Sequence, residues 1–127
     1  MRTTILILSL TLLGLTSCNM EYDYSVRVHN GTSEPLTISY KTVNDRSGQV
    51  EKSITLAPDQ WEVIIQTINL PNENGWRSNK SLVAEYVYAY KGDNIQSHLD
   101  WNSEKIKLER SDIGQAEYFI DYTDADF

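Results

Sequence analysis

The sequence has little of several residue types that mark common kinds of site. It contains one cysteine, two histidines and three prolines in 127 residues. A single cysteine excludes an internal disulfide, a cysteine-rich metal site and a redox pair of thiols. Lysine and arginine number 11 against 18 acidic residues, which gives a net charge of −7. Because nucleic-acid binding needs a surplus of basic side chains, we expect no nucleic-acid partner.

Long apolar runs are also absent, apart from one near the N-terminus. An almost wholly apolar run at residues 5–15 follows Arg2, and residues 1–17 contain no acid. This run is too short for a membrane-spanning helix, which takes about 20 residues. A basic start, a short apolar segment and small residues after it are typical of a secretory signal peptide. The alternative is a buried N-terminal helix or strand.

The sole cysteine comes directly after this segment, in Leu15-Thr16-Ser17-Cys18. This motif resembles the bacterial lipobox, in which an aliphatic residue and two small residues precede the cysteine. The resemblance implies that residues 1–17 are a lipoprotein signal peptide, that a diacylglyceryl group is attached to the Cys18 thiol, and that an acyl chain such as palmitate is added to its new amine. Two or more acyl chains hold a protein stably on a membrane. With ordinary cleavage nearby, Cys18 would instead remain a free thiol.

Residues 18–23 are expected to form the lipidated cysteine and a short tether. Lipoproteins retained in the inner membrane of enteric bacteria usually carry Asp after the cysteine, whereas this chain has Asn19. The resemblance therefore implies the outer membrane. Glu21 and Asp23 are similar to the short acidic export signals of Bacteroidota surface lipoproteins, but a solvated tether explains them equally well. The periplasmic and surface faces of the membrane both remain open.

After residue 23 the dominant pattern is alternation of apolar and polar residues, which is typical of half-buried β-strands. Residues 24–29 and 36–41 alternate in this way on either side of the turn signal Asn30-Gly31, and they predict a hairpin. Further strands are predicted at residues 51–56, 61–68, 81–90 (the longest), 95–101, 105–109 and 116–122.

The strand pattern predicts the architecture. Val63-Ile64-Ile65 is apolar on both faces, so we place residues 61–68 at the centre of a sheet. No segment of useful length has the spacing of an amphipathic helix. We therefore predict that residues 24–127 form one all-β domain, an antiparallel sandwich of about seven or eight strands.

One local motif refines this prediction. Residues 112–118 read DIGQAEY and fit the D-x-G-x-A-x-Y pattern, which resembles that of immunoglobulin-like domains. The resemblance implies that Asp112 and Gly114 make a turn and that the Tyr118 hydroxyl bonds back to it as a tyrosine corner. Ile120 stands where antibody domains carry their second cysteine, so the resemblance implies an Ig-like or related topology. In length and layout the chain resembles small Bacteroidota-type lipoproteins with one such domain.

Signals for catalysis are scarce. His29 and His98 lie on predicted strands, and the sequence has no nucleophile signature. With so many carboxylates in the chain, an acidic pair carries little information. The acidic residues 121–127 predict either oxygen ligands for Ca²⁺ or a solvated tail. We expect a protein that is not an enzyme and that holds no cofactor or metal.

Aromatic residues are the best candidates for binding. Trp76 lies with Asn74 and Arg77 in a long polar loop, where it contacts either a ligand or, as a plug, the rest of the domain. Tyr88 is the middle residue of a tyrosine stripe on residues 81–90, and the stripe predicts either a half-buried sheet face or an exposed stacking surface.

The two remaining tryptophans, Trp61 and Trp101, lie on predicted strands, where we expect them to pack.

Two functions of different classes remain open. The first is a membrane-anchored, non-enzymatic cell-envelope lipoprotein whose domain is a protein-interaction or structural module. The second is a carbohydrate-binding surface lipoprotein that uses Trp76 and nearby aromatic residues. The partners expected are the membrane, through the lipid, and an envelope protein or a glycan.

Overall fold

The computed structural model describes residues 21–67, 70–71, 80–92, 94–112 and 114–127, and in them the fold is all-β. The described residues include no helix that is long and apolar enough to cross a membrane. Seven strands have six or more residues, in agreement with the predicted number. The elements are β1 (Glu21–Asn30), β2 (Leu36–Thr42), β3 (Glu51–Leu56), β4 (Trp61–Gln66), β5 (Leu70–Pro71), the 3₁₀ helix η1 (Lys80–Leu82), β6 (Ala84–Lys91), β7 (Ile95–Gln96), β8 (Lys107–Asp112), β9 (Gln115–Tyr122) and the 3₁₀ helix η2 (Asp124–Asp126).

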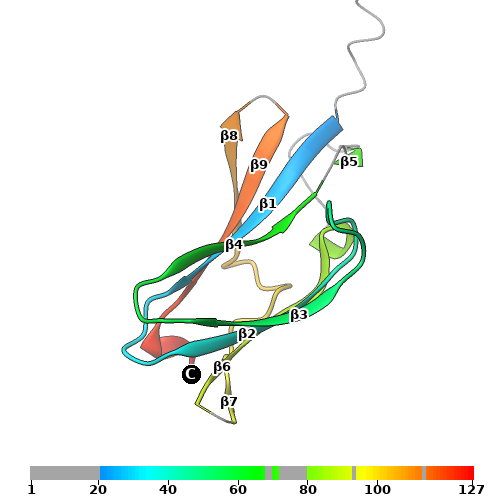
Figure 1. Ribbon diagram of the computed structural model, residues 1–127. Coiled ribbons are helices and arrows are strands. Elements are labelled where there is room, and N and C mark those ends of the chain that lie inside the picture. The colour runs from blue at the N-terminus through cyan, green and yellow to red at the C-terminus, as the bar shows by residue number, and fades with distance from the viewer. Residues whose placement is uncertain (1–20, 68–69, 72–79, 93, 113) are drawn as a thin grey trace, which may run out of the picture.

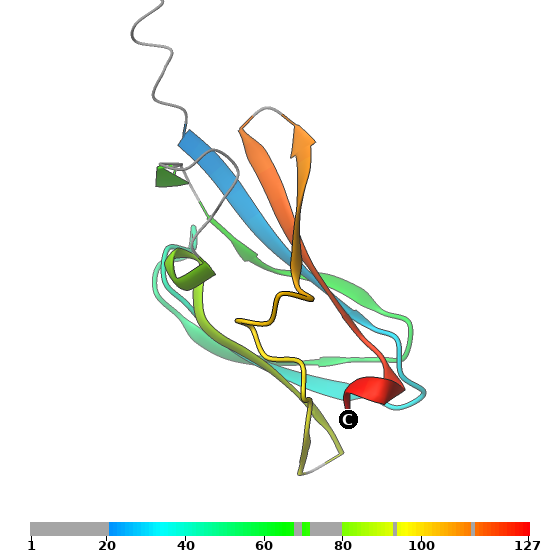
Figure 2. The same cartoon turned by 180° about the vertical axis from the view of Figure 1, so that it is seen from behind.

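The strands form two sheets, which confirms the predicted β-sandwich (Figure 1). One sheet has the order β4-β1-β9-β8, with β5 paired to β1, and the other has the order β3-β2-β6-β7. Alternate side chains of both sheets point inward and meet in a single core. The segment from β7 to β8 connects one sheet to the other (Figure 2).

One strand pair departs from the predicted antiparallel pattern. β1 and β9 run parallel over eight residue pairs, from Asp23 opposite Gln115 to Asn30 opposite Tyr122. The other pairs of named strands are antiparallel. The first and last strands of the domain therefore lie side by side in the middle of one sheet. β1 also begins at Glu21, so the strand includes residues that we expected to belong to the tether.

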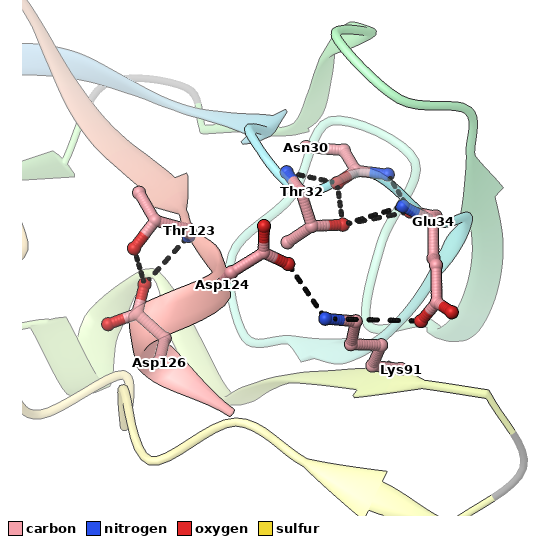
Figure 3. Close-up of polar contacts among 7 residues, drawn as sticks. All are labelled: Asn30, Thr32, Glu34, Lys91, Thr123, Asp124 and Asp126. Atoms are coloured by element: carbon pink, nitrogen blue, oxygen red, sulfur yellow. Dashed lines mark hydrogen bonds and ion pairs between the residues drawn. The ribbon is translucent and has the colours of Figure 1, made fainter.

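The predicted hairpin of β1 and β2 is wrong, because these strands belong to different sheets. The connection between them, residues 31–35, crosses from one sheet to the other. The fully buried Asn30 side chain organises this crossing (Figure 3). Its Nδ2 donates to the carbonyls of Glu34 and Leu56 at 2.8 and 3.0 Å. Its Oδ1 accepts from the backbone N–H and the hydroxyl of Thr32 at 2.9 and 2.7 Å.

Gly31 lets this crossing pass close to the end of β9. Its N–H donates to the carbonyl oxygen of Tyr122 at 2.7 Å. A Cβ atom at this position would lie 2.8 Å from the same oxygen. Asn30-Gly31 therefore ends β1 through a buried amide and a close backbone contact, and not through a two-residue hairpin turn.

The predicted central position of β4 is also wrong, because β4 forms an edge of its sheet. Ile65 and Val63 lie opposite consecutive residues of β1, so Ile64 is the extra residue of a β-bulge. Ile65 is buried and Ile64 packs against the core, whereas Val63 is exposed on the outer face. The bulge explains an apolar run that the sequence alone indicated as a strand buried on both faces.

The segments predicted at residues 81–90 and 95–101 are only partly strand. Helix η1 precedes β6, and β1, with ten residues, is the longest strand. After the two residues of β7 the chain is irregular, and Trp101 anchors it with 1% of its surface exposed. The Trp101 indole N–H donates to the carbonyl of Ala84 at 3.1 Å. The predicted packing role of Trp101 is confirmed.

The C-terminus is folded against the end of the sandwich where the chain crosses from β1 to β2 (Figure 3). Lys91 on β6 lies 2.7 Å from Asp124 and 3.9 Å from Glu34 of the β1–β2 crossing. The Asp126 carboxylate accepts from the backbone N–H of Thr123 at 2.8 Å. We predicted calcium ligands or a solvated tail for these carboxylates; Asp124 has 59% of its side-chain surface exposed and also pairs with Lys91.

Replacing the buried amide should destabilise the domain more than replacing an exposed one. Asn30→Ala leaves the N–H of Thr32 and the carbonyls of Glu34 and Leu56 without their buried partner. We expect the free energy of unfolding to fall by about 2–4 kcal/mol. Urea unfolding of the full chain in detergent, followed by tryptophan fluorescence, measures this fall. The exposed Asn102→Ala is the control and should change it by less than about 0.5 kcal/mol; equal effects would contradict the assigned role.

Candidate functional site

Most of the predicted site residues lie outside the part of the chain that the structure describes. These are Cys18, Asn74, Trp76 and Arg77, together with the side chain of Asp112. The proposed lipidation and the proposed contacts of the Trp76 loop therefore stay predictions.

The predicted structural corner falls at a hairpin within one sheet. Gly114 lies in the turn between β8 and β9 with a φ of 77°, a left-handed conformation that favours glycine. The Tyr118 ring is buried, with its centroid 5.3 Å from that of Trp101 and 6.3 Å from that of Tyr24. Burial, and to a smaller extent Tyr24, raises the pKa of the Tyr118 hydroxyl. The hydrogen bond of a tyrosine corner stays a prediction.

Tyr88 lies on an outer sheet surface that we call the tyrosine face. Its residues form three rows across β6, β2 and β3. Each row consists of an outward tyrosine of β6, the residue of β2 paired with it, and the residue of β3 paired with that β2 residue. Tyr86, Tyr88 and Tyr90 have intermediate exposure, which agrees with a half-buried sheet face, and they still line an open groove on the outside of the sheet. The rows are Tyr86-Lys41-Glu51, Tyr88-Ser39-Ser53 and Tyr90-Thr37-Thr55.

Contacts within the tyrosine face hold its rings in place. Tyr86 stacks on Tyr88 with ring centroids 5.3 Å apart and an interplanar angle of 24°. The Tyr86 hydroxyl donates to the Glu51 carboxylate, and this hydrogen bond raises the pKa of Tyr86 to about 12. A groove of about 430 Å³ runs over the face, lined by the three tyrosines and by Ser39, Glu51, Lys52 and Ser53.

The outer surface of the other sheet carries a cluster that the sequence did not indicate. His29 on β1 lies between Trp61 on β4 and Asp121 on β9, which are its neighbours in register. Its Nδ1 is 2.6 Å from the Asp121 carboxylate, and its Nε2 is 2.8 Å from the carboxylate of Asp59 in the β3–β4 turn. Asp59 adopts a φ of 63°, which aspartate tolerates better than most residues.

The two carboxylates favour the charged imidazolium, since both ring nitrogens then donate. Partial burial lowers the pKa of His29, but the hydrogen bonds to Asp121 and Asp59 raise it by more, so the pKa lies above its ordinary value of 6.5. Within the described residues, no group of three or more His, Cys, Asp or Glu side chains is placed to hold a metal ion.

Aromatic side chains extend this cluster across the sheet. The Trp61 ring stacks on His29 with centroids 4.2 Å apart, and Phe119 meets Trp61 edge-on at 6.3 Å. The Arg27 guanidinium lies 5.7 Å from the Phe119 ring centroid. We call Trp61, His29, Phe119, Arg27 and Val63 the tryptophan patch.

Trp61 has 48% of its surface exposed, so its predicted packing role is wrong. It follows the Pro58-Asp59 turn as the first residue of an edge strand, where only one side of the strand is paired. The turn signal was visible in the sequence, but the edge position depends on sheet order. His29 and Asp121 are 92 residues apart, and only the parallel pairing brings them together.

Comparisons with protein-family models, with curated proteins and with solved structures found no match.

The raised pKa of His29 predicts a pH-dependent contribution to stability. Because the pKa is higher in the folded state, the contribution is complete below pH 6.5 and is lost as the pH rises through the folded pKa. Denaturant unfolding of the full chain at a series of pH values from about 5.5 to 9 should show this loss. His29→Gln should abolish it, and His98→Gln, on an exposed residue, should leave it in place. A pH profile that His29→Gln does not change would contradict the assigned hydrogen bonds.

Proposed function

We propose that this chain is a lipid-anchored, non-enzymatic protein of the bacterial cell envelope whose β-sandwich binds a partner protein through the tryptophan patch. The lipobox-like motif at residues 15–18 supports the anchor. The surface exposure and the rigid support of Trp61 support the binding function.

The position of the patch relative to Cys18 fits this function. Only residues 19 and 20 separate Cys18 from β1, so the lipid would hold the start of β1 within about 10 Å of the membrane surface. His29 lies eight residues further along β1, a distance of about 26 Å. Figure 1 shows β1 running towards the end of the sandwich that holds the C-terminus. The tryptophan patch therefore lies towards the end that faces away from the membrane.

The composition of the patch is that of a protein-binding surface. Tryptophan and arginine are the residue types that most often contribute large shares of binding energy, and they do so when their geometry is fixed in advance. Trp61 is fixed by stacking on His29, whose two ring nitrogens are bonded to Asp59 and Asp121. A partner that covers Trp61 would bury a large aromatic surface without ordering a mobile side chain. This exposed, braced tryptophan is the observation that carries the proposal.

The alternative function, carbohydrate binding centred on Trp76, stays a prediction. Trp76, Asn74 and Arg77 lie outside the described residues, and Tyr88 is the predicted binding residue that the structure describes.

The lipid anchor is tested by metabolic labelling. When a Gram-negative host that expresses the full chain is grown with an alkyne-tagged palmitate, the protein should acquire the label and fractionate with membranes. Cys18→Ser should remove the label, because the acceptor thiol is lost, while Ser17→Ala, which keeps a small residue before the cysteine, should keep it. Labelling that persists in Cys18→Ser would contradict the anchor.

The partner-binding surface is tested by photocrosslinking in the bacterium that carries the gene. A photoreactive amino acid at position 63, beside Trp61, should give one adduct of defined mass. Adding Trp61→Ala should reduce that adduct about tenfold or more, because it removes the main anchor. Adding Ile95→Ala, which truncates an exposed apolar residue on the other sheet, should leave it unchanged. Equal adduct yields in the two variants would exclude the patch as the binding surface.

A further inference from the structure

We propose that the tyrosine face is a second binding site, and that its ligand is a neutral glycan chain lying along the groove over β6, β2 and β3. The site is on the opposite sheet from the tryptophan patch and does not depend on the protein-binding function.

The chemistry of the face matches that of a sugar ring. A pyranose has an apolar C–H face, which stacks on aromatic rings, and hydroxyl groups around its edge, which need hydrogen-bond partners. The tyrosine face presents an aromatic column on β6 and, directly beside it, columns of hydroxyl and charged groups on β2 and β3. Ser39 and Ser53, whose hydroxyl oxygens are 3.2 Å apart, lie in the same row as Tyr88. A ligand stacked on Tyr88 therefore meets hydroxyl partners at its edge.

The dimensions allow more than one sugar unit. The Tyr86 and Tyr88 ring centroids are 5.3 Å apart, about the width of one sugar ring, and Tyr90 continues the column two residues further along β6. The groove of about 430 Å³ is within the range of small-molecule sites. It is open along the sheet, as a site for an internal stretch of a polymer must be.

The charges on the face favour a neutral ligand. Lys41 is neutralised by Glu85, with its Nζ 3.0 Å from the carboxylate. In the groove itself, Lys52 is offset by Glu51, which also accepts the Tyr86 hydroxyl. No excess of one sign remains among these four side chains to select a polyanion or a polycation. Their donors and acceptors suit the uncharged hydroxyls of a glycan.

The residues around the tyrosines favour a glycan over a protein partner. Tyrosine is common at protein interfaces, but lysine, glutamate and serine are depleted at their centres. The three rows of the tyrosine face instead contain tyrosine, serine, threonine, lysine and glutamate, with no aliphatic side chain.

Two of the tyrosine rings are held in position before a ligand binds, since Tyr86 donates a hydrogen bond to Glu51 and stacks on Tyr88. A fixed ring loses little entropy when a sugar stacks on it.

Affinity electrophoresis tests this site. The full chain in detergent is run in native gels that contain xylan, galactomannan or a soluble β-1,3-glucan, with polygalacturonate as the charged comparison. We expect at least one of the three neutral polysaccharides to retard the protein. Tyr88→Ala should weaken that binding about tenfold, because it removes the central ring. Ile95→Ser, a surface substitution away from the face, should leave it unchanged.

Tyr88→Phe guards against a folding artefact. It keeps the ring and should keep most of the retardation, and its thermal unfolding midpoint should match that of Tyr88→Ala to within a few degrees. Retardation by none of the three neutral polysaccharides, retardation by polygalacturonate alone, or equal retardation of Tyr88→Ala and the unmodified chain would each overturn the proposal. None of these outcomes affects the crosslink expected at position 63, so the glycan site and the protein-binding site are tested independently.

Discussion

The rest of the structure depends on the parallel pairing of the first strand with the last. β1 and β9 form the middle of one sheet over eight residue pairs. Their inward side chains, Tyr24, Val26 and Val28 on β1 and Tyr118 and Ile120 on β9, form much of the core. Their outward side chains bring His29 beside Asp121 and Arg27 beside Phe119. The core and the tryptophan patch are thus two faces of the same pairing.

The end of the sandwich where β1 finishes is held together by polar groups. The buried amide of Asn30 orders the crossing to the second sheet, and Lys91 joins that crossing to the C-terminal turn through Glu34 and Asp124. These contacts keep both sheets in a fixed relation although the chain passes between them. The two proposed sites depend on this fixed relation, because in each of them the spacing of the side chains follows from the register of one sheet.

The alternation of apolar and polar residues predicted the strands and the side chains that share a face, because these depend on neighbouring residues alone. The strand predicted at residues 51–56 has the bounds of β3, and the stripe that includes Tyr88 was predicted to be half-buried. Both predictions rest on alternation, which indicates which side chains share a face. Sheet order was not predictable in this way, since no local signal links β1 to a strand 92 residues later. The bulge at Ile64 made β4 look central, and Trp61, which was assigned to packing because it lies on a strand, is exposed at the edge of the sheet. The cluster around His29 was missed because its members come from three distant segments.

The most direct test of this account is cysteine cross-linking between β1 and β9. In parallel register Arg27 lies opposite Phe119, with Cα atoms about 5 Å apart, which is within the range that a disulfide spans. His29 and Gln115 are six positions out of register, so they lie about 20 Å apart. Paired cysteines at 27 and 119 should form a disulfide readily under mild oxidation, and paired cysteines at 29 and 115 should not. A disulfide between positions 29 and 115 but not between 27 and 119 is what an antiparallel pairing centred on Val26 and Tyr118 would give. That result would contradict the parallel pairing on which the core and the tryptophan patch depend.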